Sequence, residues 1–295
     1  MYDLKSIYRA SSVTDAIEAL QQDPQAVVIC GGSDVLIRIR EGKLSDRPLV
    51  SIHGLPELSQ IYLEPEGELV IGPAVPFAQV TRHPLIQRLV PALGEAVDQA
   101  GGPQLRNVGT IGGNICNGAT SADSASTLLT LNAVVELTSP EGMRRVPLEE
   151  FYRGPGRVDL HPAELCTAIR IARKDYEGFY GHYIKYAQRN AMDIATLGCA
   201  VHVKLNQEKT AVEQLRLAFG VAAPTPIRCR ETERLAAGLP LDRELLNLVG
   251  RTAVTEVNPR TSWRASREFR LQLVRELSQR ALTEAARRAG GVLDA

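Results

Sequence analysis

The most constraining feature of this sequence is a glycine-rich segment near the middle of the chain. Between Gly101 and Asp123 the sequence contains six glycines and three asparagines. Glycine inside a helix or strand costs conformational entropy and offers no side chain to pack. The segment therefore predicts irregular loops instead of ordinary helices or strands.

A second glycine loop lies earlier in the chain. The apolar run Val27 to Cys30 predicts a strand that meets the pair Gly31-Gly32. A short helix through Ile39 follows, with Ser33 or Asp34 as its cap. This order predicts a strand, a glycine turn and a helix.

The loop from Cys30 to Asp34 and the segment from Thr110 to Asn114 share one chemical capability. Glycine reaches turn conformations in which successive N–H groups point into one concavity, and a helix start adds about half a positive charge. A pyrophosphate would suit two such loops. The alternative, equally open at this point, is that each glycine pair only makes a tight turn.

Several classes of protein are disfavoured by what the sequence lacks. No Gly-x-Gly-x-x-Gly follows a first strand and no glycine loop ends in Gly-Lys-Ser or Gly-Lys-Thr, which argues against a Rossmann domain or a nucleotide triphosphatase. Basic and acidic residues both number 34, and this net charge of zero argues against a nucleic-acid partner. No apolar run approaches the roughly 20 residues of a membrane helix, and charges interrupt the start of the chain as they would not in a secretion signal.

The cysteines and histidines form no metal-binding or redox motif. The five cysteines are odd in number and widely spaced, and the five histidines show no mutual spacing typical of metal ligands. We therefore expect free thiols in a reducing, cytoplasmic compartment. The length of 295 residues, 44% of them hydrophobic, suffices for one large domain or two ordinary ones.

Local patterns predict most elements of the first part of the chain. The capping box Ser12 to Asp15 begins a helix that ends near Asp23-Pro24. Beyond it we expect strands of a mixed sheet over 48–52, 61–63 and 68–71, two helices between Phe77 and Gln99, a helix over 124–131, a hairpin of 134–138 with 143–148, and a strand over 165–171.

The pattern of predicted elements changes after Lys174. Strands over 183–186, 198–205 and 215–221 predict an antiparallel sheet, and helices over 231–237, 243–257 and around 269–281 follow it. Strands followed by helices are typical of an α+β domain. We therefore expect two domains, residues 1–174 and 175–295.

Two charged residues admit both a structural and a functional interpretation. Asp123 can cap the helix that follows it or hold a ligand hydroxyl such as a ribityl or ribose oxygen. Lys185 lies on an alternating strand, where a solvated lysine is the ordinary case. Its neighbours Arg189 and Asp193 can simply pair with each other.

The segment from Pro259 to Arg270 is rich in arginine and contains the single tryptophan, Trp263. Arginine and tryptophan are enriched in the energetic centres of protein interfaces, which favours a partner surface. A solvated start of a helix explains the same composition equally well.

Three long strings of the sequence carry a resemblance to a known family. They are Val28 to Leu36, Gly109 to Asn117 running on to Asp123, and Phe219 to Pro226. In these strings and from end to end, the chain resembles the FAD-binding (medium) subunits of bacterial xanthine dehydrogenases, within the molybdenum hydroxylase family. The resemblance implies an α+β fold: a two-part FAD-binding domain of the vanillyl-alcohol oxidase (PCMH) type, then a smaller C-terminal domain of the CO dehydrogenase flavoprotein type.

The resemblance also implies a set of cofactor-binding residues. In the family both glycine loops hold the FAD pyrophosphate, an aspartate contacts FAD, and the loop matching 186–196 lies near the flavin ring. Carried over residue by residue, the implied FAD-binding residues are Val27, Val28, Ile29, Cys30, Gly31, Gly32, Ser33, Asp34, Thr110, Ile111, Gly112, Gly113, Asn114, Asp123, Leu165 and Lys185.

The function that the resemblance implies is electron transfer within a larger oxidoreductase. Molybdopterin on a large partner subunit oxidises the substrate, 2Fe-2S clusters on a small partner subunit carry the electrons, and FAD on this chain reduces NAD in a heterotrimer of purine metabolism. Alternatives left open are oxygen or another acceptor, a carbon monoxide, aldehyde or heteroaromatic hydroxylase, and a non-catalytic scaffold.

Overall fold

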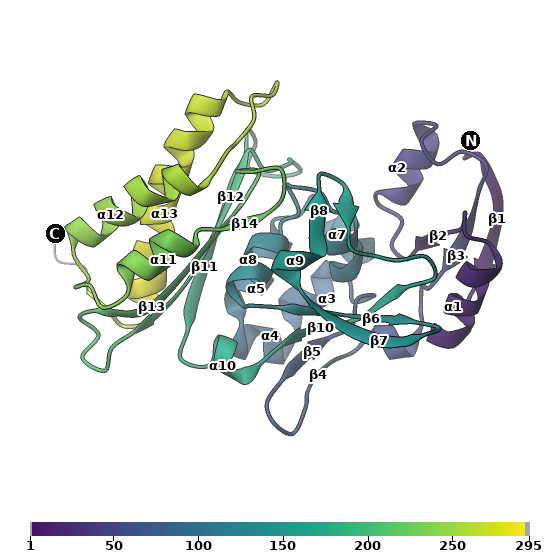
Figure 1. The fold of residues 1–295 in the computed structure, drawn as a ribbon, viewed down its shortest axis with the longest axis horizontal. Coiled ribbons are helices and arrows are strands. Elements are labelled where there is room, and N and C mark those ends of the chain that lie inside the picture. The colour runs from purple at the N-terminus through teal and green to yellow at the C-terminus, as the bar shows by residue number, and fades with distance from the viewer. Residues whose placement is uncertain (1, 293–295) are drawn as a thin grey trace.

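The computed structural model describes residues 2–292, so the outermost residues of both expected domains, 1 and 293–295, lie outside it. The chain forms three lobes in a row, which follow one another in sequence from the purple to the yellow end of Figure 1. Each lobe has its own hydrophobic core. The described helices are all too short or too polar to span a bilayer.

The first lobe is a small parallel sheet in the order β1-β3-β2. The Ser12 hydroxyl accepts a hydrogen bond from the amide of Asp15 at 3.1 Å, so the predicted helix start is confirmed. The strand β1 was not predicted, because it is largely exposed and has no alternating apolar face. The elements are β1 (Leu4–Arg9), α1 (Val13–Gln22), β2 (Val27–Ile29), α2 (Val35–Arg40) and β3 (Arg47–Ser51).

The second lobe is built on a five-stranded antiparallel sheet in the order β4-β5-β10-β6-β7. The expected mixed sheet is therefore wrong, since β3 belongs to a different sheet from β4 and β5. The strands of this sheet are β4 (Ile61–Leu63), β5 (Leu69–Ile71), β6 (Val134–Ser139), β7 (Gly142–Pro147) and β10 (Leu165–Ile171). The same part of the chain contains the 3-10 turn η1 (Pro56–Leu58), the short helix α9 (Leu148–Phe151) and a separate two-stranded sheet of β8 (Tyr152–Gly154) and β9 (Arg157–Val158).

Six short helices complete the second lobe and correct two expectations. Three helices, not two, lie between Phe77 and Gln99, because Pro84 and Pro91 each begin a new helix at its first turn. The glycine-rich segment also contains two helices, one starting at Pro103 and the other capped by Thr110. The six are α3 (Phe77–Arg82), α4 (Pro84–Leu89), α5 (Pro91–Asp98), α6 (Pro103–Val108), α7 (Ile111–Cys116) and α8 (Ala125–Thr130).

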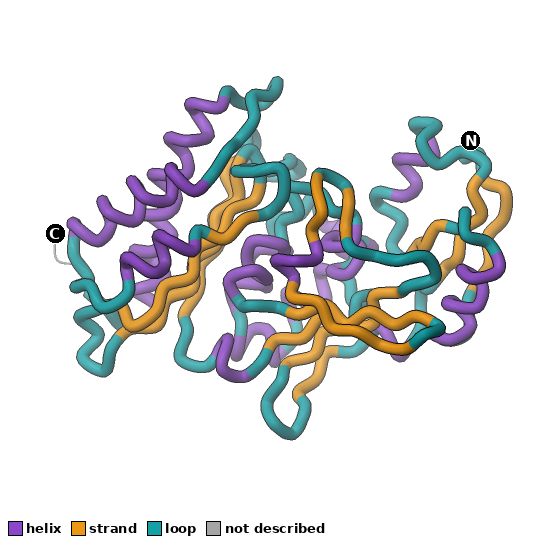
Figure 2. Tube along the Cα trace, viewed as in Figure 1, coloured by secondary structure: helices purple, strands orange, loops and turns teal. Residues whose placement is uncertain are grey.

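The third lobe is the predicted antiparallel sheet followed by helices. The helices lie on the outer face of the sheet (Figure 2), while α5 and α8 of the second lobe pack on its other face. The boundary expected near Lys174 stays a prediction. The elements are α10 (Arg173–Tyr176), β11 (Tyr180–Tyr186), β12 (Leu197–Leu205), β13 (Val212–Gly220), β14 (Ile227–Arg228), α11 (Arg230–Ala236), α12 (Arg243–Glu256) and α13 (Arg267–Arg288).

Buried polar contacts join the second and third lobes at α8. The Arg228 guanidinium donates to the carbonyl of Leu129 at 2.7 Å and pairs with Glu233 at 2.6 Å. The buried His202 ring lies 2.9 Å from the Thr130 hydroxyl. Since α8 begins two residues after Asp123, these contacts hold the helix that ends the glycine-rich segment.

Candidate functional site

The two glycine loops lie against each other. A Cβ atom on Gly31 would lie 1.8 Å from the carbonyl oxygen of Val108, so only glycine permits this approach. The same Cβ would lie 3.2 Å from the amide nitrogen of Gly109, the residue before Thr110. The fold therefore brings together the two loops that the sequence singled out.

The first loop presents backbone amides without partners. Gly32 has φ +74°, a conformation that glycine adopts without strain. Among the described residues, the N–H groups of Gly32, Ser33 and Asp34 have no hydrogen-bond acceptor, and the stretch from Val27 to Ser33 is half-buried. Successive free amides at such a turn form a concavity suited to an anion.

The second loop differs from the first in its amides. The N–H groups of Ile111 and Gly112 donate to the carbonyls of Val75 and Pro73, at 3.1 and 2.9 Å, and that of Gly113 donates to the Thr110 hydroxyl at 3.1 Å. The expectation of two equivalent amide loops is therefore not met.

The glycines of the second loop allow close packing on one side and leave open space on the other. A Cβ on Gly112 would lie 2.3 Å from Pro73, so this glycine lets α7 pack closely on the chain before α3. Gly113 is exposed, and a Cβ there would meet only the Thr110 hydroxyl, at 3.0 Å. The missing side chain at Gly113 therefore leaves open space next to Thr110.

Asp123 and Lys185 form a buried ion pair. The carboxylate accepts hydrogen bonds from the Lys185 ammonium and the Tyr183 hydroxyl, both at 3.0 Å, and Lys185 also donates to the carbonyl of Gln99 at 2.8 Å. Burial raises the pKa of the Asp123 carboxyl above its ordinary value, although the charge of Lys185 opposes that rise. Asp123 is thus no helix cap, and Lys185 is not the solvated lysine that its strand position favours; both interpretations are wrong.

This ion pair is tied to the second loop. The Asn114 side-chain oxygen accepts from both the amide and the hydroxyl of Ser124, at 3.3 and 2.6 Å, next to Asp123 in sequence. The amide of Val221, in the third of the quoted strings, donates to the carbonyl of Thr120 at 3.0 Å. Loops from both lobes therefore hold the carboxylate in place.

Leu165 lies at the start of β10 and is buried in the core of the first lobe. It offers only an apolar side chain and its backbone. Arg189 and Asp193 do pair, at 3.6 Å, as expected.

Sequence reasoning missed two residues that complete the arrangement, Tyr183 and Gln99. Tyr183 could have been found, because residues two apart on a strand share a face and Lys185 was already a candidate. Gln99 acts through its backbone carbonyl, a contact that depends on tertiary structure and left no signal in the sequence.

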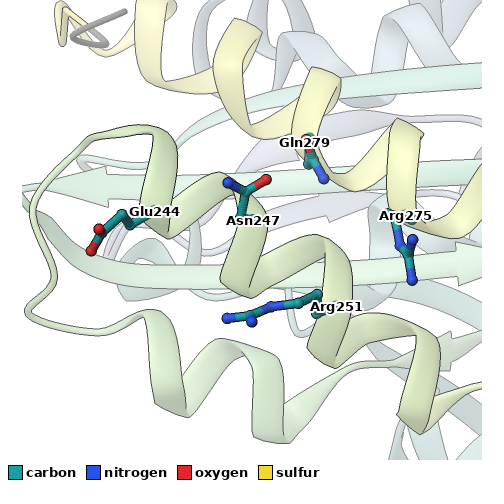
Figure 3. A pocket seen from close by; sticks show the side chains of 5 residues that line it. All are labelled: Glu244, Asn247, Arg251, Arg275 and Gln279. Carbon is teal, nitrogen blue, oxygen red and sulfur yellow. The ribbon is translucent and has the colours of Figure 1, made fainter.

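A separate surface hollow of about 630 Å³ lies between α12 and α13 (Figure 3). It is lined by Glu244, Asn247, Arg251, Arg275 and Gln279, none of them a predicted cofactor residue. Within residues 2–292 no three His, Cys, Asp or Glu side chains gather as metal ligands.

Two family models match most of the chain. The family model described as the FAD binding domain in molybdopterin dehydrogenase matches residues 2–173, and the CO dehydrogenase flavoprotein C-terminal domain matches residues 182–285. The xanthine dehydrogenase FAD-binding subunit of Escherichia coli O157:H7 is 45% identical over 293 residues, covering 99% of this chain and 100% of that protein. The carbon monoxide dehydrogenase medium chain of Afipia carboxidovorans is 29% identical over 289 residues, 96% of each.

A solved structure matches the whole fold. Carbon monoxide dehydrogenase from Hydrogenophaga pseudoflava, in a form lacking part of its molybdenum cofactor, superposes with a TM-score of 0.91 at 27% identity, over 98% of this chain and 99% of that one. The expected α+β fold, an FAD-binding domain followed by a smaller C-terminal domain, is confirmed. The chain belongs to the family of FAD-binding medium subunits of molybdenum hydroxylases.

Proposed function

We propose that this chain is the FAD-carrying electron-transfer subunit of a xanthine dehydrogenase that reduces NAD. The observation that carries the proposal is the close packing of two glycine loops, one with free amides and the other with open space at Gly113. The 45% identity to the xanthine dehydrogenase FAD-binding subunit supports this choice of complex.

The residues of this chain fit the parts of FAD by their chemistry. Free amides of the first loop bind the pyrophosphate anion, with the half-buried residues from Val27 onward beside it. A carboxylate oxygen has spare lone pairs, so Asp123 accepts a further hydrogen bond from a cofactor hydroxyl while Lys185 stays paired with it. The site needs no catalytic side chain of its own: when bound, FAD supplies the electron and hydride exchange.

The first experiment tests whether the chain binds flavin at all. The protein purified with FAD should be yellow, with absorbance near 450 nm, and should oxidise NADH with an artificial electron acceptor. A colourless protein that takes up no added FAD would favour the scaffold alternative. Bound FAD without NADH oxidation would point to oxygen or another acceptor.

The second experiment tests the division of labour among subunits. Alone, the chain should show no activity toward xanthine, since we propose that the molybdenum cofactor and the iron–sulfur clusters lie on large and small partner subunits. Adding those subunits should restore xanthine-dependent NAD reduction. If the assembled complex instead oxidises carbon monoxide, an aldehyde or a heteroaromatic compound, the family assignment stands and the substrate changes.

A further inference from the structure

The hollow between α12 and α13 lies in the third lobe, at the other end of the molecule from the first lobe (Figures 1 and 3). Its volume of about 630 Å³ falls within the range of about 300 to 1,000 Å³ that is typical of sites for small molecules. The apolar residues of both helices face the core of the lobe. The side chains that line the hollow are all polar or charged: Glu244, Asn247 and Arg251 from α12, and Arg275 and Gln279 from α13.

A buried glycine in the middle of α12 gives the hollow its shape. A Cβ on Gly250 would lie 2.4 Å from Nε2 of Gln279, and 3.1 Å from both Cγ and the carbonyl oxygen of Arg275. Glycine inside a helix is less favourable than alanine, but here it lets the Arg275 and Gln279 side chains lie directly on the backbone of α12. These two side chains are therefore placed beside Arg251, the residue that follows Gly250.

The arginines of the hollow are free to bind a ligand. Within residues 2–292 no carboxylate lies within ion-pair distance of Arg251 or Arg275, and none of the lining side chains takes part in a hydrogen bond. On the same helix α13, by contrast, Arg280 pairs with Glu276 at 3.6 Å. A guanidinium offers five N–H donors in a planar fork that matches the oxygen atoms of a carboxylate or a phosphate. Two such groups beside each other therefore favour an oxyanion.

The opposite end of the hollow is acidic. Glu244 precedes Arg251 by about two turns of α12, which is roughly 10 Å along the helix axis. Asn247 lies between them, one turn from each. A carboxylate accepts hydrogen bonds from a hydroxyl or an ammonium group. The two ends of the hollow therefore favour a ligand that is anionic at one end and carries a hydrogen-bond donor at the other.

We propose that the hollow between α12 and α13 is a binding site for a small organic oxyanion, a carboxylate or a phosphate monoester, with an ammonium or hydroxyl group at its opposite end. Arg251 and Arg275 bind the oxyanion, and Glu244 binds the donor at the far end. Asn247 and Gln279 form hydrogen bonds to the part of the ligand between them. The site shares no residue with the glycine loops or with the ion pair of the proposed FAD site, so it goes beyond the proposed function.

The test uses the FAD-loaded full chain and matched pairs of probes, with binding measured by isothermal titration calorimetry. One pair is hexanoate and 6-aminohexanoate, and the other is propyl phosphate and 3-aminopropyl phosphate. Within each pair the second compound adds only a terminal ammonium group, while comparison between the pairs distinguishes a carboxylate from a phosphate. We expect the aminated compound of at least one pair to bind, and to bind more tightly than its partner.

Variants then locate the binding. Arg251→Met and Arg275→Met each remove a guanidinium from an exposed side chain and should weaken binding by about 10-fold, as for the loss of a hydrogen bond to a charged group. Glu244→Gln should abolish the difference in affinity between the two members of a pair. The matched control is Arg280→Met, which removes the same charge from an exposed arginine of α13 that does not line the hollow, and it should leave the affinity unchanged.

Three results would overturn the proposal. The first is that none of the probes binds, and the second is that Arg251→Met and Arg275→Met bind them as tightly as the unmodified chain does. The third is an equal loss of affinity in Arg280→Met, because attraction would then follow the general charge of the surface instead of the hollow. Flavin absorbance should be the same in every variant, so failure of the proposed function, a chain that binds no FAD, is a separate result.

Discussion

Replacing Gly31 with alanine tests whether contact between the glycine loops creates the cofactor site. The new Cβ would lie 1.8 Å from the carbonyl oxygen of Val108, and real Cβ atoms stay about 3.0 Å or more from such an atom. Because the two nearest atoms, the carbonyl oxygen and carbon of Val108, belong to the backbone, no side chain can rotate away to relieve the clash. The first loop must therefore move by more than an ångström away from the second.

The size of the effect follows from hydrogen-bond geometry. A displacement above 1 Å takes an amide beyond the roughly 3.2 Å limit of a good hydrogen bond. Each charge-assisted bond lost to a phosphate costs about 1.5 to 3 kcal/mol, a factor of roughly 10 to 150 in affinity. The chain should still fold, because β2 is an edge strand with half-buried residues and overpacking costs about 1 to 3 kcal/mol.

The assay is titration of the flavin-free protein with FAD, followed by flavin fluorescence, together with a thermal melt. Gly94→Ala is the matched control, because its new Cβ would make ordinary contacts, the nearest at 3.5 Å. Full FAD affinity in the Gly31→Ala protein, with Gly94→Ala also normal, would refute the idea that the loop contact shapes the site.

Three further predictions concern buried charges. Asp123→Ala should weaken FAD binding and lower the melting temperature. Adding Lys185→Met should restore the melting temperature but not the FAD affinity. If a flavin titration and a thermal melt show that both recover, the ion pair is purely structural. Burial and two nearby arginines lower the pKa of His202 to about 3, below its unfolded value of 6.5. As the pH falls, the unfolded state therefore binds the extra proton before the folded state does. The free energy of unfolding should be highest above pH 6.5 and should fall below it by about 1.4 kcal/mol per pH unit. In urea unfolding between pH 6.5 and 5.5, the His202→Leu variant should lack this slope. Arg228→Met removes the nearer of the two cations that pair with the buried Glu233, since Arg230 remains 3.7 Å away, and should cost about 3 kcal/mol of unfolding free energy in the same assay. A loss below 1 kcal/mol would show that this ion pair contributes little to stability.

The sequence predicted the elements whose signals are local. The Ser12 cap and the strands β4 and β10 were predicted at or near their observed bounds because capping boxes, alternation and turn residues act over a few positions. The same reasoning failed for β1, whose one neighbour in the sheet is the distant strand β3. It also failed for the helix α7, where Gly112 serves packing against Pro73 instead of a turn.

The same distinction between local and long-range signals holds for the candidate site. The sequence by itself determined that two glycine loops exist and that Asp123 and Lys185 carry opposite charges. Only the tertiary structure decided that Gly31 touches Val108, that the free amides belong to the first loop alone, and that the two charges meet in a buried pair. The physical reason is that the charge and hydrogen-bonding groups of a residue are properties of its own side chain. Its burial and its partners depend instead on which distant segments the packed core brings within a few ångströms.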